Sequence, residues 1–462
     1  MRRTTLSRAT TSALGTLALL ATTALTGAAP ASAAFSAALG SPARPLPAAV
    51  GHRLVAGEYA SPLTPSQCQA QLQSLCYGAT QLEQAYNEHP LFDRGINGAG
   101  RTIVIVDSYG SPTIQHDLDV YSKQFGIPST NVQVVKWGSV PTFDPTDSDM
   151  TGWAEETTID VDMAHAMAPG AKIVLVETGV SENEGTTGLP EMMDAEQSLI
   201  DKGVGDVVSQ SFGATESTFP GFDKGDYSSL LNLRYAFKDA AAHGVTVLAS
   251  SGDNGVTDSE SDGSTLYPYP VTSWPPSDPL VTAVGGTSVH LDDQGERQSP
   301  DTVWDSPATD DGASGGGKSK VFNRPSFQLG VAGVVGGSRG VPDISMVGDP
   351  KTGVWTYNSF GPQDNGWELW GGTSVACPVF SGVVALADQY AGHRLGNLNS
   401  GLYALGGLQQ LGAPGTGITD VTGGSNTYNG VPGFPATKGY DLATGWGTVN
   451  AAQFVPAIAA LG

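Results

Sequence analysis

The chain has 462 residues, of which 39% are hydrophobic and 15% are charged, so the composition indicates a buried globular core rather than disorder. Asp and Glu number 45 against 22 Lys and Arg, a formal net charge of −23, and a surface this acidic repels phosphate backbones and argues against nucleic acid as a partner. The 61 glycines and 30 prolines follow no period, which excludes collagen and indicates many tight loops.

The N-terminal segment has the three parts of a secretion signal. Arginines in the first eight residues form a basic start, an apolar stretch follows over 13–25, and a small-residue cleavage site ends at Ala33. The alternative, a membrane anchor, is less favoured because the apolar stretch is short and rich in threonine. The sequence therefore predicts a signal peptide over 1–33 and an extracellular protein without a membrane span.

The pattern after the signal indicates one large α/β domain. Residues 34–60 are rich in Ala and Pro and are interpreted as a short leader, and the domain is expected over 61–462. Buried strands alternate with helices, which predicts a doubly wound fold with a mostly parallel sheet and a site beyond the carboxyl ends of its strands. The expected strands are 103–106, 173–176, 207–208, 245–249 and 280–284, and the expected helices are 155–167, 190–201, 227–243 and 374–390; 291–340 and the tail from 410 are expected to be mostly loops.

Two of the cysteines are expected to pair. Cys68 and Cys76 lie close in sequence, and export favours a disulfide between them. Cys377 is left over, and we interpret it as a small buried residue rather than a reactive thiol.

One glycine-rich segment imitates a phosphate-binding loop. Residues 312–319 fit the pattern letter by letter, but no buried strand precedes them and Pro325 interrupts the segment that follows. The pattern needs a strand before it and a helix after it, so we do not interpret this segment as a nucleotide site.

A serine stands where an apolar helix is expected to begin. Ser374 follows a glycine pair at 371–372, a setting in which the hydroxyl is exposed beside free backbone N–H groups. Such donors can hold a developing oxyanion. The alternative interpretation is a helix N-cap with a structural role only.

Two carboxyl groups are candidates for the base that such a serine needs. Glu156 and Asp160 are four residues apart, which puts them on one face of a helix. Like charges repel there, but they can coexist if they share a proton, which raises one pKa. The alternative is a solvated acidic face near a helix start, which the neighbouring Glu155 and Asp162 favour.

A third acid, Asp253, follows the expected strand 245–249 within Ser-Ser-Gly-Asp-Asn-Gly. It therefore lies at the edge of the sheet where sites form in α/β folds. The alternative is a turn residue, because Asp and Asn are common before Gly in turns.

These residues together resemble the sedolisins, the serine-carboxyl peptidases. The resemblance rests on Gly372-Thr373-Ser374 with Pro378, on Glu156 with Asp160, and on Gly252-Asp253 with Gly255, in this order, and it covers nearly everything after about residue 60. Further stretches that agree are 168–171, 211–213, 284–287, 314–317 and 342–343.

The resemblance implies a subtilisin-like fold that carries proteolysis at acid pH. It implies that Ser374 is the nucleophile, Glu156 its general base and Asp160 the acid that orients Glu156. Asp253 would be the oxyanion partner and must be protonated to donate a hydrogen bond. Glutamate, with a reference pKa of about 4.3, still has a usable carboxylate fraction in acid, where histidine, at about 6.5, is protonated.

The resemblance also implies a calcium site near the C-terminus. The side chains of Asp420 and Asp441, with the carbonyls of Val421, Thr437 and Gly439, would supply the hard oxygens that Ca²⁺ prefers. Thr437 stands where the family often has glycine, a change that a carbonyl ligand tolerates. The alternative is a pair of acidic turns.

Two features depart from the family. Members usually carry a large N-terminal prodomain, whereas only 34–60 separate the expected signal from the family-like region. Phe212 stands where tryptophan is common, so the wall of the substrate pocket can differ, while the backbone of 211–213 can still pair with an extended peptide.

The expected function is a secreted endopeptidase that cleaves polypeptides in acid, as a monomer and with neither nucleic acid nor membrane as a partner. Two alternatives stay open. One is a conventional serine hydrolase that uses Asp107 with His116 or His165. The other is an inactive, calcium-stabilised binding protein on the same fold.

Overall fold

The computed structural model describes residues 52–306, 312–362 and 364–462. The predicted signal peptide, 1–33, and most of the predicted leader, 34–60, lie outside the described residues. Among the helices that are described, none is long and apolar enough to cross a membrane.

An eight-stranded sheet forms the centre of the fold, in the order β11-β10-β8-β6-β3-β5-β4, with β14 also paired to β10. The five expected strands are confirmed, as β3, β5, β6, β8 and β10. The strand pairs β3–β5, β3–β6, β6–β8 and β8–β10 are all parallel. Apolar strands covered on both faces are typical of a parallel sheet, so the predicted fold class is confirmed. The strands of this sheet are β3 (Thr102–Ser108), β4 (Val132–Lys136), β5 (Lys172–Thr178), β6 (Val207–Gln210), β8 (Thr246–Ser250), β10 (Thr282–Ser288), β11 (Thr302–Val303) and β14 (Ile344–Val347).

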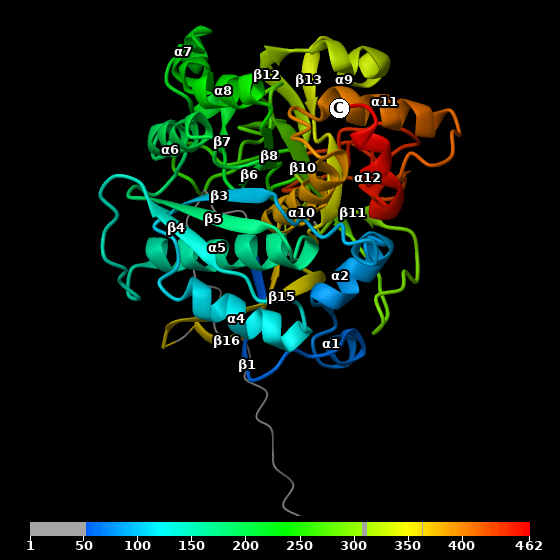
Figure 1. Ribbon diagram of the computed structural model, residues 1–462. Coiled ribbons are helices and arrows are strands. Elements are labelled where there is room, and N and C mark those ends of the chain that lie inside the picture. The colour runs from blue at the N-terminus through cyan, green and yellow to red at the C-terminus, as the bar shows by residue number, and fades with distance from the viewer. Residues whose placement is uncertain (1–51, 307–311, 363) are drawn as a thin grey trace, which may run out of the picture. The chain divides into compact units, whose positions relative to one another are not determined.

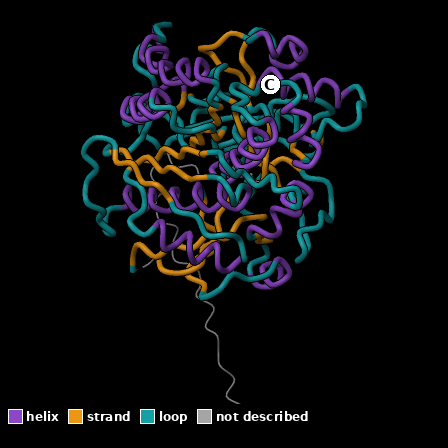
Figure 2. Tube along the Cα trace, in the orientation of Figure 1, coloured by secondary structure: helices purple, strands orange, loops and turns teal. Residues whose placement is uncertain are grey.

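Helices cover both faces of this sheet (Figures 1 and 2). On one face, α6 (Leu189–Asp201) and α8 (Tyr235–His243) share an apolar core with the strands. On the other, α5 (Ser148–Met167) and α10 (Thr373–Ala391) pack against each other and against the central strands. The two helices that carry Glu156 and Ser374 are therefore neighbours in the core.

The remaining helices surround these layers, and several differ from expectation. The expected helix 227–243 is broken into three pieces, and the tail after residue 410 contains a helix, α12, that the sequence did not predict. α5 begins earlier than expected, because the Asp147 side chain caps it by accepting hydrogen bonds from the N–H groups of Asp149 and Met150. The helices outside the two layers are α1 (Pro65–Gln71), α2 (Ala79–Ala85), α3 (His89–Phe92), α4 (Ile114–Phe125), α7 (Ser228–Leu231), α9 (Ala332–Val335), α11 (Asn399–Gln410) and α12 (Ala451–Ala459). Short 3-10 turns lie at η1 (Glu216–Thr218), η2 (Phe222–Lys224), η3 (Asn232–Arg234) and η4 (Ser326–Val331).

A second sheet, in the order β1-β16-β15-β2, lies beyond α5 and leads into the candidate site. Its first strand, β1 (Arg53–Tyr59), comes from the predicted leader and pairs antiparallel with β16 (Asp364–Gly371), Arg53 opposite Gly371. This segment of the leader is thus part of the domain. The other strands of this sheet are β2 (Leu75–Tyr77) and β15 (Thr352–Gly361), and two-stranded sheets are formed by β7 (Ala214–Thr215) with β9 (Ser273–Trp274), β12 (Gly317–Asn323) with β13 (Ser338–Val341), and β17 (Ile418–Thr419) with β18 (Thr448–Val449).

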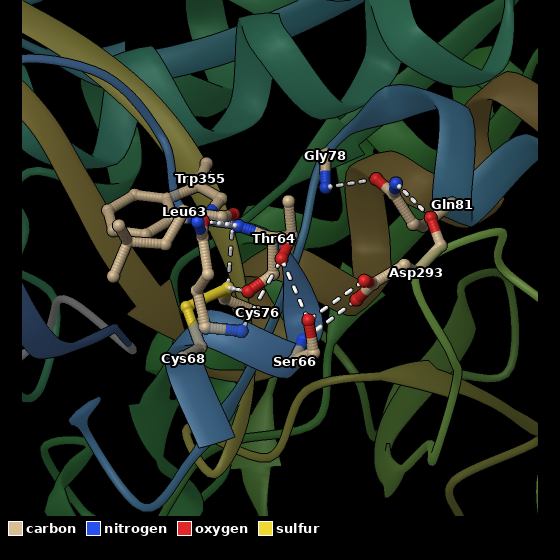
Figure 3. The surroundings of a disulfide bond; sticks show 10 residues. Leu63, Thr64, Ser66, Cys68, Cys76, Gly78, Gln81, Asp293 and Trp355 are labelled. Atoms are coloured by element: carbon tan, nitrogen blue, oxygen red, sulfur yellow. Dashed lines mark hydrogen bonds between the residues drawn. A yellow bond between two sulfur atoms is a disulfide. The ribbon is translucent and has the colours of Figure 1, made fainter. Parts of the chain in front are cut away.

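A disulfide between Cys68 and Cys76 ties α1 to β2, with a Cα–Cα distance of 6.0 Å, so the predicted pairing is confirmed (Figure 3). Next to it, Ser66 donates hydrogen bonds from N and Oγ to the carboxylate of Asp293, each at 2.8 Å. Cys377 is free and fully buried, and burial raises its pKa to about 12, which agrees with a packing role.

Candidate active site

The N-terminus of α10 presents the candidate nucleophile. The chain turns from β16 into the helix through Gly372, whose φ of 137° is rarely adopted by residues with a side chain. Ser374 is fully buried, and its Oγ has no hydrogen-bond partner among the described residues. Pro378 lacks an N–H, so the Ser374 carbonyl loses its intrahelical donor and instead accepts from Ser211 Oγ at 3.5 Å. Ser374 thus presents an unpaired hydroxyl at the N-terminus of α10.

The predicted acid pair lies on α5 and faces the interior. Glu156 and Asp160 are one turn apart and both fully buried, which contradicts the alternative of a solvated face. Asp160 Oδ1 accepts a hydrogen bond from Ser211 Oγ at 2.6 Å, so Ser211 bridges Asp160 and the Ser374 backbone. Burial, together with the negative charges of Asp107 and Glu156, raises the pKa of Asp160 well above its usual value. Asp160 therefore keeps its proton to a higher pH than an exposed aspartate does.

Asp107, at the carboxyl end of β3, is a third acid beside the pair. It is fully buried, and burial followed by the charge of Glu156 raises its pKa well above the usual range. The sequence suggested Asp107 only as part of a conventional triad with His116 or His165. His165 Nε2 instead contacts the Pro128 carbonyl at 2.7 Å, and the His116 ring packs beside Tyr357, with centroids 6.3 Å apart.

Asp253 meets the N-terminus of α10 directly. Its Oδ1 accepts hydrogen bonds from N and Oγ1 of Thr373, each at 2.8 Å. Its Oδ2 is buried and has no partner in the described part of the chain. Burial raises the pKa of Asp253 to about 7, although Arg53 and the Thr373 hydrogen bonds lower it. Below that pH a protonated Oδ2 can donate a hydrogen bond beside Ser374.

His52, which precedes β1, and Arg53, its first residue, also lie in this site. His52 Nδ1 is 2.5 Å from Glu156 Oε2, and its Nε2 is 3.3 Å from Glu155 Oε2. Burial lowers the pKa of His52, but the hydrogen bonds and charges of both glutamates outweigh burial and raise it to about 9. Arg53, the next residue, donates to Asn254 Oδ1 at 3.2 Å. No pattern in the sequence signals either contact.

The glycine-rich segment that imitates a phosphate loop supports Asp253 instead. Its Gly315 N–H donates to the Gly252 carbonyl at 2.7 Å, and Ala313 N–H donates to the Asp253 carbonyl at 2.9 Å. A Cβ on Gly315 would lie only 2.0 Å from the Ser251 carbonyl oxygen, so this close backbone approach requires glycine. The segment continues into a strand, β12, rather than a helix.

The five residues predicted to bind calcium form one loop cluster. Asp420 Oδ2 accepts from Gly439 N–H at 2.9 Å, and Asp441 Oδ2 accepts from Thr437 N–H at 2.8 Å. Asp420 Oδ1 is buried without a hydrogen-bond partner among the described residues, so an oxygen is left for a ligand. The donor set, which adds the Val421 carbonyl, contains only oxygens, the atoms that Ca²⁺ prefers as ligands. No group of three or more His, Cys, Asp or Glu side chains in the described ranges is arranged to hold a metal ion, and this set has only two carboxylates.

Comparisons with known proteins agree with this geometry. The model of the Subtilase family matches residues 147–398, more than half of the chain. Kumamolisin of Bacillus sp. (strain MN-32) is 33% identical over 384 residues, which are 80% of this chain and 62% of that protein. Sedolisin of Pseudomonas sp. (strain 101) is 32% identical over 363 residues, 77% of this chain and 57% of that protein.

A solved structure carries the same fold. Pseudomonas sedolisin, described as a serine-carboxyl proteinase complexed with two molecules of pseudo-iodotyrostatin, aligns with a TM-score of 0.68 and 27% identity. The alignment covers 84% of this chain and 99% of that one.

The chain belongs to the Subtilase family. Within it, the similarity is to kumamolisin and sedolisin, and the fold is the subtilisin-like fold of sedolisin. The matched region is less than two thirds of each of these two curated relatives, 62% and 57%.

Proposed function

We propose that this protein is a secreted serine-type endopeptidase that hydrolyses polypeptides at acid pH through an acyl-enzyme on Ser374. The observation that carries the proposal is that Ser374, with an unpaired hydroxyl, and Asp253 meet at the N-terminus of α10, where Ser211 links Asp160 of the buried Glu156–Asp160 pair to the Ser374 carbonyl. The similarity to kumamolisin and sedolisin supports the class of enzyme.

In acylation, Glu156 accepts the proton of Ser374 Oγ while that oxygen attacks the carbonyl carbon of the peptide. Asp160 shares a proton with Glu156 and holds its carboxyl in place. The proton then passes from Glu156 to the leaving amine as the C–N bond breaks. Glu156 next takes a proton from water, whose oxygen attacks the ester, and returns that proton to Ser374 Oγ as the ester C–O bond breaks and the acid product leaves.

Asp253 stabilises the negative charge that develops on the carbonyl oxygen. Its Oδ1 is fixed by two hydrogen bonds from Thr373, which leaves Oδ2 to carry a proton toward the oxyanion. Because burial raises the pKa of Asp253 to about 7, the donor form exists in acid and is lost as the pH rises through neutrality. This loss supports an acid-acting enzyme.

His52 engages one carboxyl oxygen of the proposed base, Glu156. In the arrangement described here, Glu156 Oε2 contacts His52 rather than Ser374. Displacement of His52 with the start of β1 frees that oxygen. The segment of the chain that ends at the start of β1 and includes His52, here called the N-terminal segment, is therefore expected to limit activity while it remains in place.

Calcium is proposed for the loop cluster formed by Asp420, Val421, Thr437, Gly439 and Asp441. When bound, it would screen the carboxylates of Asp420 and Asp441 and tie together two parts of the connection between β17 and β18. It takes no part in the chemistry proposed for Ser374. The protein is further proposed to act outside the cell and as a monomer.

The direct test is hydrolysis of a denatured protein at about pH 4 and about pH 8, by wild type and by Ser374→Ala. Hydrolysis in acid by the wild type alone is expected. No hydrolysis at either pH, by a folded wild type freed of its N-terminal segment, would favour an inactive binding protein instead.

A further inference from the structure

Two acids that the proposed chemistry does not use, Asp117 on α4 and Asp162 on α5, lie where α4, α5 and β15 pack against one another. Both side chains are fully buried. Burial first, and then the negative charge of Asp117, raise the pKa of Asp162 well above its usual value. The two carboxyls are therefore close enough to repel each other when both are ionised. We call Asp117 and Asp162 the carboxyl pair.

Asp117 has hydrogen-bond donors that stabilise its charged form. Its Oδ2 accepts a hydrogen bond from Thr113 Oγ1 at 2.6 Å, and its Oδ1 accepts one from Ser359 Oγ at 2.5 Å. Ser359 belongs to β15, so this second bond ties α4 to the sheet. Burial raises the pKa of Asp117, but the two hydroxyls lower it. Because hydrogen bonds to a carboxylate favour the charged form, Asp117 ionises before Asp162 does.

Asp162 has much less to stabilise its charge. Neither of its carboxyl oxygens has a hydrogen-bond partner among the described residues, and both are buried. The backbone of Tyr357, on β15, lowers the pKa of Asp162 by less than the charge of Asp117 raises it. An ionised Asp162 beside an ionised Asp117 would be a buried charge without a partner, which is costly. Asp162 is therefore protonated while α4, α5 and β15 stay packed together.

The surrounding elements supply little positive charge to the carboxyl pair. In the part of the chain that the structure describes, no Lys, Arg or His forms an ion pair with Asp117 or Asp162. His116, on α4, is exposed, and its charge lowers the pKa of Asp117 by less than the Ser359 and Thr113 hydroxyls do. The repulsion within an ionised pair would therefore remain.

The other titratable groups near the carboxyl pair do not neutralise it either. Tyr121, on α4, is fully buried, and its pKa is raised by burial and then by the charges of Asp162 and of Glu83, on α2. On α5 itself, His165 Nε2 contacts the Pro128 carbonyl at 2.7 Å, and burial lowers the pKa of this histidine. An ionised carboxyl pair thus faces a further acid rather than a fixed cation.

We propose that the carboxyl pair is a pH-sensitive contact that holds α4 and β15 against α5 while Asp162 is protonated and releases them when both acids are ionised. Asp162 lies two residues after Asp160, so release also disturbs the helix that carries the proposed base. The packed arrangement binds a proton that the released one gives up. Its advantage is therefore full below about pH 4 and falls by up to about tenfold per pH unit as the pH rises toward the raised pKa of Asp162.

The test measures amide hydrogen exchange of the full-length Ser374→Ala protein, as protection factors corrected for the intrinsic effect of pH. Protection of α4 should fall at least about tenfold between about pH 5 and about pH 7.5. Asp162→Asn, added to Ser374→Ala, puts an amide of the same shape in place of the titrating acid, so α4 should keep its protection. Asp119→Asn, an exposed acid on the same helix, is the matched control and should leave the fall unchanged. Each protein is compared with itself at the two pH values, so a variant of lower overall stability can still be scored.

An equal fall of α4 protection in Asp162→Asn, or protection that does not change with pH, would overturn the proposal. A parallel fall in α6, on the other face of the sheet, would also overturn it, because the whole domain would then be opening. If Asp162→Asn does not fold, Asp117→Asn decides: it removes the repulsion within the pair, so the fall should be smaller, and an equal fall would contradict the proposal. All of these proteins carry Ser374→Ala, so the outcomes are independent of the proposed peptidase function.

Discussion

His52 and Glu156 are 104 residues apart in sequence, yet His52 Nδ1 lies 2.5 Å from Glu156 Oε2 inside the protein. The imidazole also stands edge-on to Trp370, with ring centroids 4.8 Å apart. A raised pKa of about 9 keeps His52 charged at neutral pH, so the contact is an ion pair with the group proposed as the general base. His52 therefore holds the carboxylate that is proposed to accept the proton of Ser374.

Replacing His52 should activate the full-length chain. His52→Ala removes the cation from Glu156, and hydrogen bonds to charged groups contribute ~1.5–3 kcal/mol, so the initial rate in acid should rise at least about tenfold. The rate is measured on chains whose intact mass is confirmed. His393→Ala, an exposed histidine, should leave the rate unchanged. Equal rates for wild type and His52→Ala would show that His52 does not restrain Glu156.

Removing the nucleophile or the base should abolish activity without unfolding the protein. Ser374→Ala takes away the attacking oxygen, and Glu156→Gln leaves an amide that cannot accept its proton, so each should lower kcat by about a thousandfold or more. Circular dichroism checks the fold. Substantial activity in a folded Ser374→Ala protein would show that another group is the nucleophile.

The sequence predicts the parts of the site that lie on regular elements. Glu156 and Asp160 share a helix face by spacing alone, and Asp253 follows a parallel strand whose carboxyl end must meet the edge where sites form. Ser374 could be found because a glycine pair before an apolar run indicates a helix N-terminus.

The sequence could not predict contacts between segments without periodicity. His52 lies in a short extended segment, and its partner is fixed only when β1 pairs with β16. Likewise, the role of Gly315 depends on a backbone approach to Ser251 that the tertiary fold creates. The helix 227–243 was expected to be continuous, and its breaks at 232–234 reflect local 3-10 geometry that apolar spacing does not reveal.

Stability should fall as the pH rises. Glu88 is fully buried with both carboxyl oxygens unpaired among the described residues, and burial and then Glu83 raise its pKa well above the usual range. The native state thus binds a proton that the unfolded chain, with a carboxyl pKa of about 4.3, releases. Stability is therefore full below about pH 4 and declines above it, by up to about 1.4 kcal/mol per pH unit for this group.

Glu88→Gln removes that titration, so its melting temperature should decline less than that of the wild type between about pH 4 and about pH 8. Asp93→Asn, a nearby exposed acid, is the control and should follow the wild type. Parallel curves for wild type and Glu88→Gln would mean that Glu88 is not protonated in the native state.

Chelation of calcium should lower the melting temperature. A ligand bound only by the native state stabilises it by mass action, by about 2.7 kcal/mol at a hundred times its dissociation constant. Asp441→Asn should reduce the effect of added Ca²⁺, because Asp441 is one of the two carboxylates in the loop cluster. A melting temperature that does not change on chelation, in protein verified to have lost its metal, would argue against the site.

The most direct measurement of the central claim is the pH dependence of kcat/KM for wild type and Asp253→Asn, both freed of the N-terminal segment. A protonated Asp253 is proposed to hold the oxyanion, and its pKa of about 7 sets where that donor is lost. Wild type should be most active in acid, below about pH 5.5, and fade toward neutrality as the carboxyls ionise. Asp253→Asn keeps a donor that does not titrate, so it should retain part of the activity and lose less of it on the alkaline side. A wild-type optimum near pH 8, or an alkaline limb that is the same in Asp253→Asn, would contradict the carboxyl mechanism.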